Sequence, residues 1–297
     1  MRRAGSVLER IGHPVRMTVT QDAVHDVHER RPASALAHLV TCVWIQTVSA
    51  QSPAFTHRKA PNGSVEIVCA LGSMPRILGP QTGPIEEVLA PGSTIVGVRL
   101  RPEAASCVLG LPSSALVDLV LGADELWGDR GHALGEHLDA ASSAQEAAAH
   151  LERAVAERLA DAAAPDPLVA EGVRLLMAGR RADVSSMASS LFISERQLRR
   201  RFEAATGLAP TTLHRILRFQ RFLALAWIRE RPSKQVARLA VEAGYADHAH
   251  LSREAARLEG RSPRTFLSES ELRCGCEHDH SASYGPLLRH RPHVATS

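Results

Sequence analysis

Apolar positions in the first part of the chain come in short runs, and Gly and Pro lie in the stretches between these runs. Between residues 37 and 101 these runs cover residues 39–45, 64–71, 76–78, 87–89 and 93–100. Short runs of this kind, punctuated by turn residues, are typical of strands. The pattern predicts a compact antiparallel sheet or a small barrel, with Asn62-Gly63 as a hairpin turn.

After these runs the apolar spacing changes to that of helices. Residues 133–162 are rich in Ala and predict a helical region with a break near Ser142-Ser143. The stretch 162–167 reads Ala-Ala-Ala-Pro-Asp-Pro and predicts a hinge between two domains. The expected organisation is therefore a loosely ordered segment 1–30, a β-rich domain with C-terminal helices at 31–163, a helical domain at 164–269 and a disordered tail at 270–297.

The helical domain contains an internal repeat. Four residues of one stretch, Leu198, Arg200, Gly207 and Pro210, return 53 positions later as Leu251, Arg253, Gly260 and Pro263. Ala188 returns as Ala240, which is 52 positions later, so a one-residue shift falls in the turn between two helices. Two copies of one module on a single chain can reach two neighbouring segments of a DNA groove.

The first copy has the pattern of a helix-turn-helix. Ser194 is a candidate N-cap, because its hydroxyl can accept a hydrogen bond from a free backbone N–H group of the first turn. Leu198 and Phe202 share one face of the following helix, and Gly207 is a stop signal. The second copy repeats this arrangement with Asp247 as the cap and Gly260 as the stop.

A strongly apolar stretch, residues 211–228, joins the two copies. Its apolar residues lie on several faces, as in a helix that is packed from more than one side. Arg218 and Arg221 interrupt this surface, and we expect them to mark its solvent or phosphate edge.

The charge distribution sets this domain apart. Residues 184–268 hold 15 Lys and Arg against 7 Asp and Glu, whereas the whole chain has a formal net charge of +3. Concentrated positive charge of this kind indicates contacts with phosphates, and Arg can also grip guanine with two hydrogen bonds.

Residues from about 167 to 269 resemble the DNA-binding domain of AraC/XylS-type bacterial transcriptional regulators. The matching segments are residues 194–202, 206–207, 210, 236–240, 243–245, 251–253 and 260–263. The resemblance implies two helix-turn-helix motifs joined by a long helix, in an α+β protein. It also implies base-edge contacts at Arg196, Arg199 and Arg200 in the first copy and at Ala249, Ser252 and Arg253 in the second. From their places on the polar faces of the helices, Gln197, Arg218 and His248 are further candidate DNA contacts.

The second copy departs from the family pattern at three positions. Ala255 stands where an aromatic residue is usual, Ala256 where Lys is frequent, and Glu259 where an apolar residue is common. Ala249 is too short to form a hydrogen bond with a base edge. We therefore expect the second module to read fewer bases than the first.

The β-rich half shows a weaker resemblance to the sensory halves that precede such DNA-binding domains, at residues 61–63, 97–102 and 109–112. It implies a cupin-like barrel followed by helices that pair between subunits. A small-molecule effector, RNA polymerase and a second copy of the chain are thus candidate partners beside double-stranded DNA. Trp44, Arg99 and Arg101 could surround an anionic or aromatic effector, although such residues more often belong to the core and rim of a sheet.

Two other functions need to be weighed. A DNA-repair enzyme that transfers an alkyl group would need a Cys activated by a neighbouring base, and Cys42, Cys69 and Cys107 have no such sequence context. A metal-sensing regulator could use the close Cys and His residues of segment 274–280, which also reads as part of a disordered tail.

Five scattered cysteines indicate reduced thiols. The start of the chain lacks the apolar core of a signal peptide, and the chain has no long apolar stretch. We expect a cytoplasmic protein that does not associate with membranes and needs no cofactor.

Overall fold

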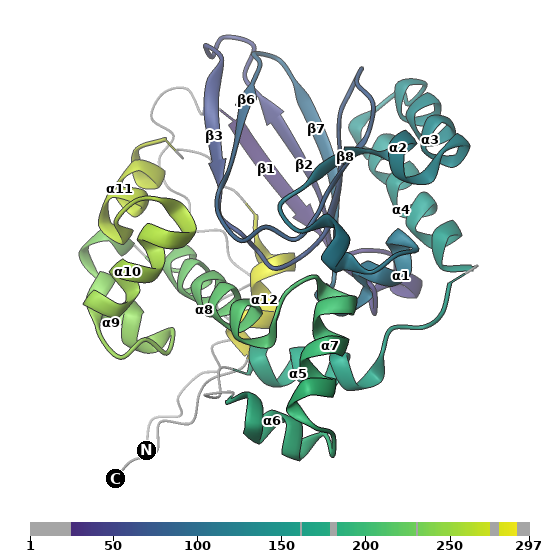
Figure 1. The fold of residues 1–297 in the computed structure, drawn as a ribbon. Helices are drawn as coiled ribbons and strands as arrows, with labels where there is room; N and C mark the ends of the chain where they lie inside the picture. Colours follow the sequence, from purple (N-terminus) through teal and green to yellow (C-terminus); the bar gives the residue numbers. More distant parts are fainter. Residues whose placement is uncertain (1–24, 161, 179–182, 230, 274–278, 290–297) are drawn as a thin grey trace, which may run out of the picture.

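The computed structural model describes residues 25–160, 162–178, 183–229, 231–273 and 279–289. Strands of the N-terminal half and helices of the C-terminal half form two adjoining parts, shown in Figure 1. The predicted α+β class, with an antiparallel β-rich part ahead of an all-α part, is confirmed.

Most strands form one antiparallel sheet with the order β1-β2-β7-β4-β5-β8. Its members are β1 (His25–Arg30), β2 (Val40–Val48), β4 (Glu66–Ala70), β5 (Arg76–Leu78), β7 (Thr94–Leu100) and β8 (Val120–Gly122). Strands β3 (Phe55–Lys59) and β6 (Ile85–Leu89) pair with each other in a second sheet. Because β3 and β4 belong to different sheets, Asn62-Gly63 lies in a connection between sheets, and the predicted hairpin is wrong.

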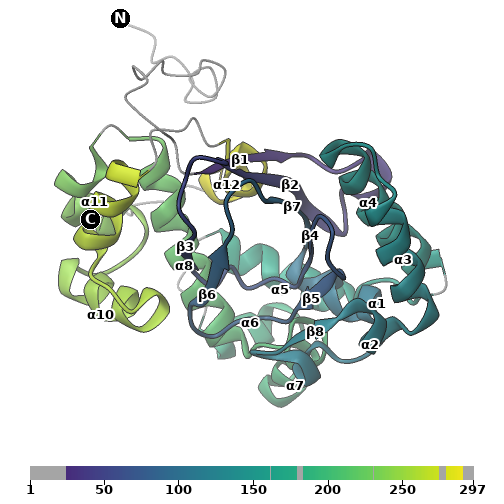
Figure 2. The same ribbon diagram turned by 90° about the horizontal axis from the view of Figure 1, so that it is seen from above.

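The large sheet has an apolar core on each face. On one face its side chains pack against helices α1 (Ala105–Leu109), α3 (Asp129–Asp139) and α4 (Ala144–Ala160). On the other face a smaller core, which includes Trp44 and Leu89, lies between the two sheets. Figure 2 shows β3 and β6 set apart from the large sheet, with α3 and α4 on its opposite side.

Helices α3 and α4 correspond to the Ala-rich region of the sequence. Helix α4 buries Ala148, Leu151 and Val155 at three- and four-residue spacing, so one of its faces covers the sheet. The predicted break at Ser142-Ser143 falls in the connection between the two helices. The short helix α2 (Ala123–Trp127) precedes them.

The C-terminal part is built around helix α8 (Pro210–Trp227), whose Phe219 and Phe222 are fully buried. Helix α5 (Pro167–Met177) and the pair α6 (Val184–Ser190) and α7 (Glu195–Thr206) precede it. The pair α9 (Val236–Glu242) and α10 (His248–Glu259) follows it, and α11 (Pro263–Arg273) comes next.

Parts of two segments that are expected to be loose form regular secondary structure. Strand β1 begins at His25, within the segment 1–30, and α12 (Ser281–Arg289) lies within the predicted disordered tail. Helix α12 is held between β1 and α8: the Ser283 N–H donates to Glu29, and Arg221 Nη1 donates to the Leu287 carbonyl at 3.0 Å. Arg221 is therefore buried, and the expectation that it marks a solvent edge is wrong.

Among the helices that the structure describes, none is long and apolar enough to cross a membrane.

Candidate nucleic-acid interface

Helix α7 starts and ends as its sequence predicts. Ser194 Oγ accepts a hydrogen bond from the Gln197 N–H, and Gln197 Oε1 accepts one from the Ser194 N–H at 3.0 Å. At the other end Gly207 adopts φ of 78°, a left-handed conformation that suits glycine. Gln197, a predicted DNA contact, thus also serves as the second member of a capping box.

The two faces of α7 have opposite character. Leu198 and Phe202 are fully buried, while Arg196, Arg199 and Arg200 are exposed to solvent. Arg201 Nη1 lies 2.6 Å from Asp166, the N-cap of α5, whereas Arg199 pairs within α7, where its Nη2 lies 3.7 Å from Glu195. Three arginines are therefore displayed from one rigid helix.

Helix α10 of the second motif is capped in the same way. Asp247 Oδ1 accepts a hydrogen bond from the His250 N–H at 2.6 Å, and Gly260 ends the helix with φ of 70°. The predicted contacts His248, Ala249 and Arg253 are exposed, and Ser252 is half-buried. At the positions that match Arg196, Arg199 and Arg200, α10 carries one arginine, Arg253, and a second exposed arginine, Arg257, follows one turn later.

Arg218 occupies the space between α8 and the second motif. Its guanidinium lies over the Tyr245 ring at 4.5 Å, and its side chain is 18% exposed. Arg218 Nη2 lies 3.5 Å from His250 Nε2 and 4.0 Å from Glu254 Oε2. These contacts hold α10 against α8, and the predicted role of Arg218 as a phosphate contact remains a prediction.

Glu254 was not singled out in the sequence, yet it is central to this junction. It is buried on α10 and accepts a hydrogen bond from Arg215 Nε at 2.9 Å. The neighbouring Ala255 is also buried, at the position where the family pattern places an aromatic residue. Ion pairs of Glu254 therefore hold the second motif against α8. A single Glu in a helical sequence does not reveal such a role, because its partners lie on another helix.

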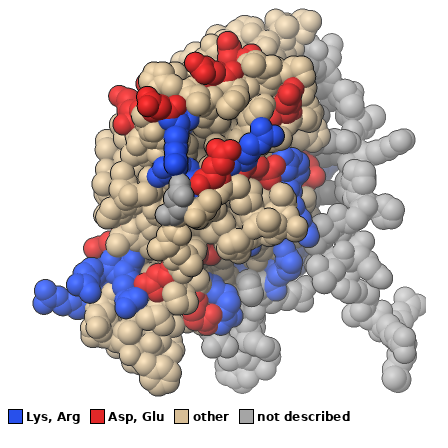
Figure 3. Space-filling model, turned by 90° about the vertical axis from the view of Figure 1, so that its right-hand side faces the viewer, with Lys and Arg blue, Asp and Glu red and all other residues tan. Residues whose placement is uncertain are grey.

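In Figure 3 several Lys and Arg side chains lie in the lower part of the face, in the region where Figure 1 places α6 and α7, and a few Asp and Glu side chains lie among them. Acidic and basic side chains are also mixed over the upper part of this face.

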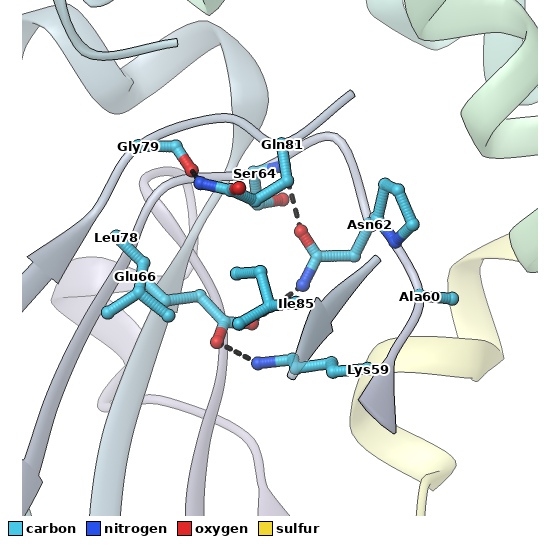
Figure 4. Close-up of a pocket in the computed structure, with 10 residues that line it drawn as sticks. Lys59, Ala60, Asn62, Ser64, Glu66, Leu78, Gly79, Gln81 and Ile85 are labelled. Atoms are coloured by element: carbon cyan, nitrogen blue, oxygen red, sulfur yellow. Dashed lines mark hydrogen bonds and ion pairs between the residues drawn. The ribbon is translucent and has the colours of Figure 1, made fainter. Parts of the chain in front are cut away.

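A small cavity lies beside the connection from β3 to β4. Its volume is about 20 Å³, which is room for a water molecule, and Figure 4 shows the side chains around it. Its lining is Lys59, Ala60, Pro61, Asn62, Ser64, Glu66, Leu78, Gly79, Gln81 and Ile85.

Glu66 is the centre of a buried charge network beside this cavity. It accepts hydrogen bonds from Lys59, from Asn62 Nδ2 at 2.7 Å and from Arg99 Nε at 2.6 Å. Burial by itself would raise the pKa of Glu66, but Lys59 and Arg99 outweigh it and hold the pKa at about 2. Arg99 Nη1 also lies 3.6 Å from Glu29.

The three residues considered for an effector do not converge on the cavity. Trp44 is a core side chain beneath Lys59 Nζ, which lies 5.2 Å from its ring. The charge of Arg99 is matched by Glu66 and Glu29, and Arg101 Nε donates to the Ala37 carbonyl at 2.9 Å.

The thiols give little support to an alkyl-transfer site. Burial raises the pKa of Cys69 to about 11 and that of Cys42 to about 12, and it also raises the pKa of Cys107. A thiolate is the reactive form, so these three groups are poor nucleophiles at neutral pH.

Within the described residues no three His, Cys, Asp or Glu side chains lie together as a metal site. Residues 274–278 of the predicted Cys- and His-containing segment lie outside the described part of the chain.

Two family models match the chain. Residues 28–122 match a domain of unknown function, DUF6597, and residues 187–269 match a helix-turn-helix domain. The C-terminal part is an AraC-type DNA-binding domain. The resemblance to the AraC/XylS family is thereby confirmed, and this AraC-type domain spans both motifs from α6 to α11.

Known structures show weaker similarity. A crystal structure of ToxT from Vibrio cholerae has a TM-score of 0.39 and 10% identity, over 82% of this chain and 96% of that one. The AraC-like transcriptional activator CuxR has a TM-score of 0.19 and 14% identity, over 68% of this chain and 87% of that one. No curated protein matches the sequence.

Proposed function

We propose that this AraC-type regulator binds DNA sequence-specifically in the cytoplasm and responds to a small-molecule effector through its N-terminal part. The observation that carries the DNA-binding role is the display of Arg196, Arg199 and Arg200 on one face of α7, whose other face is buried. A rigid helix with this arrangement suits the major groove, where Arg can pair with guanine.

The arrangement of the two motifs suggests how the DNA element that they bind is organised. Two recognition helices held by one connecting helix would occupy successive major-groove faces about 34 Å apart. We propose a direct, non-palindromic element with stringent bases under α7 and tolerant bases under α10. Pairing of two copies through residues 133–162 and contact with RNA polymerase belong to the same proposal.

Arg200→Ala is expected to reduce the discrimination between a selected site and a scrambled duplex by about 1–3 kcal/mol, because a base-edge contact is lost. Fluorescence anisotropy at fixed salt measures both affinities. Arg31→Ala removes an equally charged, exposed side chain from the loop after β1 and should leave the discrimination unchanged. An equal loss on both duplexes for Arg200→Ala would assign this residue to the phosphates.

A response to an effector requires contact between the two parts, and the end of β3 together with its connection to β4 provides it. Arg58 Nη1 donates to the Glu259 carbonyl at the end of α10 at 2.8 Å. Gln220 Nε2, on α8, donates to the Pro61 carbonyl at 2.7 Å. Lys59 at the end of β3 and Asn62 of the connection line the cavity, so a change in the cavity would reach both α8 and α10.

Gly63→Ala is expected to loosen this contact. Gly63 has φ of 75°, and a Cβ added to it would lie 2.6 Å from Leu213 Cδ1 of α8. The strain should increase the rate of proteolytic cleavage at the predicted hinge, residues 162–167. Gly72→Ala is the matched control, because Gly72 also has a left-handed φ, of 83°, and has no atom within 4 Å of the added Cβ. Equal cleavage rates for the two variants would show that the connection does not hold the two parts together.

A further inference from the structure

The turn between α6 and α7 contains an unusual residue, Phe192. Its side chain is 95% exposed, and its backbone has φ of 56°, in the left-handed region. A bulky residue in this conformation is strained, because its Cβ crowds the backbone. Phe192 thus combines an exposed aromatic ring with an unfavourable backbone conformation.

The second motif shows what the turn itself requires. Gly244 lies 52 positions after Phe192 and has φ of 94°. The two turns share their hydrogen bonds: Phe192 N–H donates to Ser189 as Gly244 N–H donates to Val241, and the next residue of each turn bonds to Ala188 or Ala240. The turn therefore needs a left-handed residue, and glycine satisfies it without strain. The geometry of the turn therefore does not account for an aromatic side chain at position 192.

Packing does not explain the ring, since the neighbouring Leu191 is buried while Phe192 points to solvent. Its surroundings point to DNA instead. The outward residues of α6 are four exposed serines, Ser185, Ser186, Ser189 and Ser190, which carry no charge that would repel phosphates. On the other side, Ser194 caps α7, and the exposed Arg196 follows within its first turn.

The position of the turn, just before the recognition helix, indicates which part of the DNA Phe192 would contact. In helix-turn-helix proteins the N-terminal end of the recognition helix contacts the base edges, and Phe192 lies two residues before the N-cap of α7. The thymine methyl group is the apolar feature that bases present in the major groove.

We propose that Phe192 packs against the 5-methyl group of a thymine at the end of the half-site under α7, and that it helps to specify that base. This inference rests on the proposed DNA-binding function and is continuous with the arginine face of α7. It adds an apolar contact to a surface that otherwise recognises DNA through charge and hydrogen bonds.

The test is a binding-site selection with the full chain and its variants Phe192→Gly, Phe192→Asn and Phe192→Tyr. Gly and Asn both tolerate the left-handed conformation, so these variants should have a melting temperature no lower than that of the wild type. The wild type and Phe192→Tyr should select a thymine at one end of the half-site. Phe192→Gly and Phe192→Asn should lose that preference and bind the selected site about three- to tenfold more weakly, as expected for loss of a small apolar contact.

Replacing the selected thymine with uracil removes only the methyl group. This change should weaken binding by the wild type and have no further effect on Phe192→Gly. Val88→Ala is the control, because Val88 is another exposed apolar side chain, on β6, and should leave the selected sequence unchanged.

Three results would overturn the inference alone. Equal affinity and equal selected sequences for wild type and Phe192→Gly would remove Phe192 from the interface. An equal loss on all sequences would place the ring on the sugar-phosphate backbone, and loss of transcription with unchanged DNA binding would assign it to a protein partner. With any of these three results, a wild type that still selects a DNA sequence would support the proposed DNA-binding function. A wild type that selects no sequence would overturn both that function and the role of Phe192.

Discussion

Glu66→Ala is expected to lower the free energy of unfolding by about 3–5 kcal/mol, as is typical when one partner of a buried ion pair is removed. The substitution leaves Lys59 and Arg99 close together without the carboxylate that both of them contact. Arg99 is the more affected, because its side chain is 14% exposed and retains only the more distant Glu29. Urea unfolding of the full chain measures the effect.

Glu87→Ala is the control for this prediction. Glu87 pairs with Arg76 on the surface, where both side chains are more than a third exposed, and such pairs contribute at most about 1 kcal/mol. A loss for Glu66→Ala no larger than that for Glu87→Ala would show that the network around Glu66 is relaxed or hydrated. Because the pKa of Glu66 is lowered on folding, its contribution is present above the ordinary value of 4.5 and is lost as the pH falls towards 2.

Local sequence signals predicted the helix-turn-helix motifs well. The caps Ser194 and Asp247 and the stops Gly207 and Gly260 lie where the sequence placed them, because each acts on a backbone within a few residues of itself. The strands with apolar runs were also found. Strand β3 was missed, since it reads Phe-Thr-His-Arg-Lys and has no apolar alternation.

Contacts between distant parts of the chain could not be predicted in this way. The bond from Ser283 to Glu29 joins residues 254 positions apart, and it fixes α12 against β1. Arg221 on an amphipathic helix would ordinarily mark the solvent side, but α12 covers it and supplies the Leu287 carbonyl as its acceptor. The ordering of both ends of the described chain therefore depends on pairings that no local pattern contains.

Glu259 shows a further limit of sequence patterns. The sequence marks it as a departure from a commonly apolar position, and the structure buries it completely at the end of α10. Arg261 Nη2 lies 3.7 Å from its carboxylate, and Arg58 approaches its backbone from β3. Burial raises the pKa of Glu259 to about 7, although Arg261 and Arg58 act in the opposite direction. Burial likewise raises the pKa of Tyr284 on α12, and the nearby Glu29 and Glu259 carboxylates act in the same direction.

The raised pKa of Glu259 predicts a pH dependence of stability. An acid that binds its proton more tightly in the folded state contributes stability below its ordinary pKa of 4.5, and this contribution is lost as the pH rises through about 7. The wild type should therefore lose about 3 kcal/mol relative to Glu259→Gln between pH 5 and pH 8. Urea unfolding of both proteins across this range measures the difference. Parallel pH profiles would contradict the prediction, because they would mean that the Glu259 carboxylate is ionised throughout. A difference that grows with pH would show that ionisation of this one group weakens the junction of α10 with β3, where the second recognition helix meets the N-terminal part.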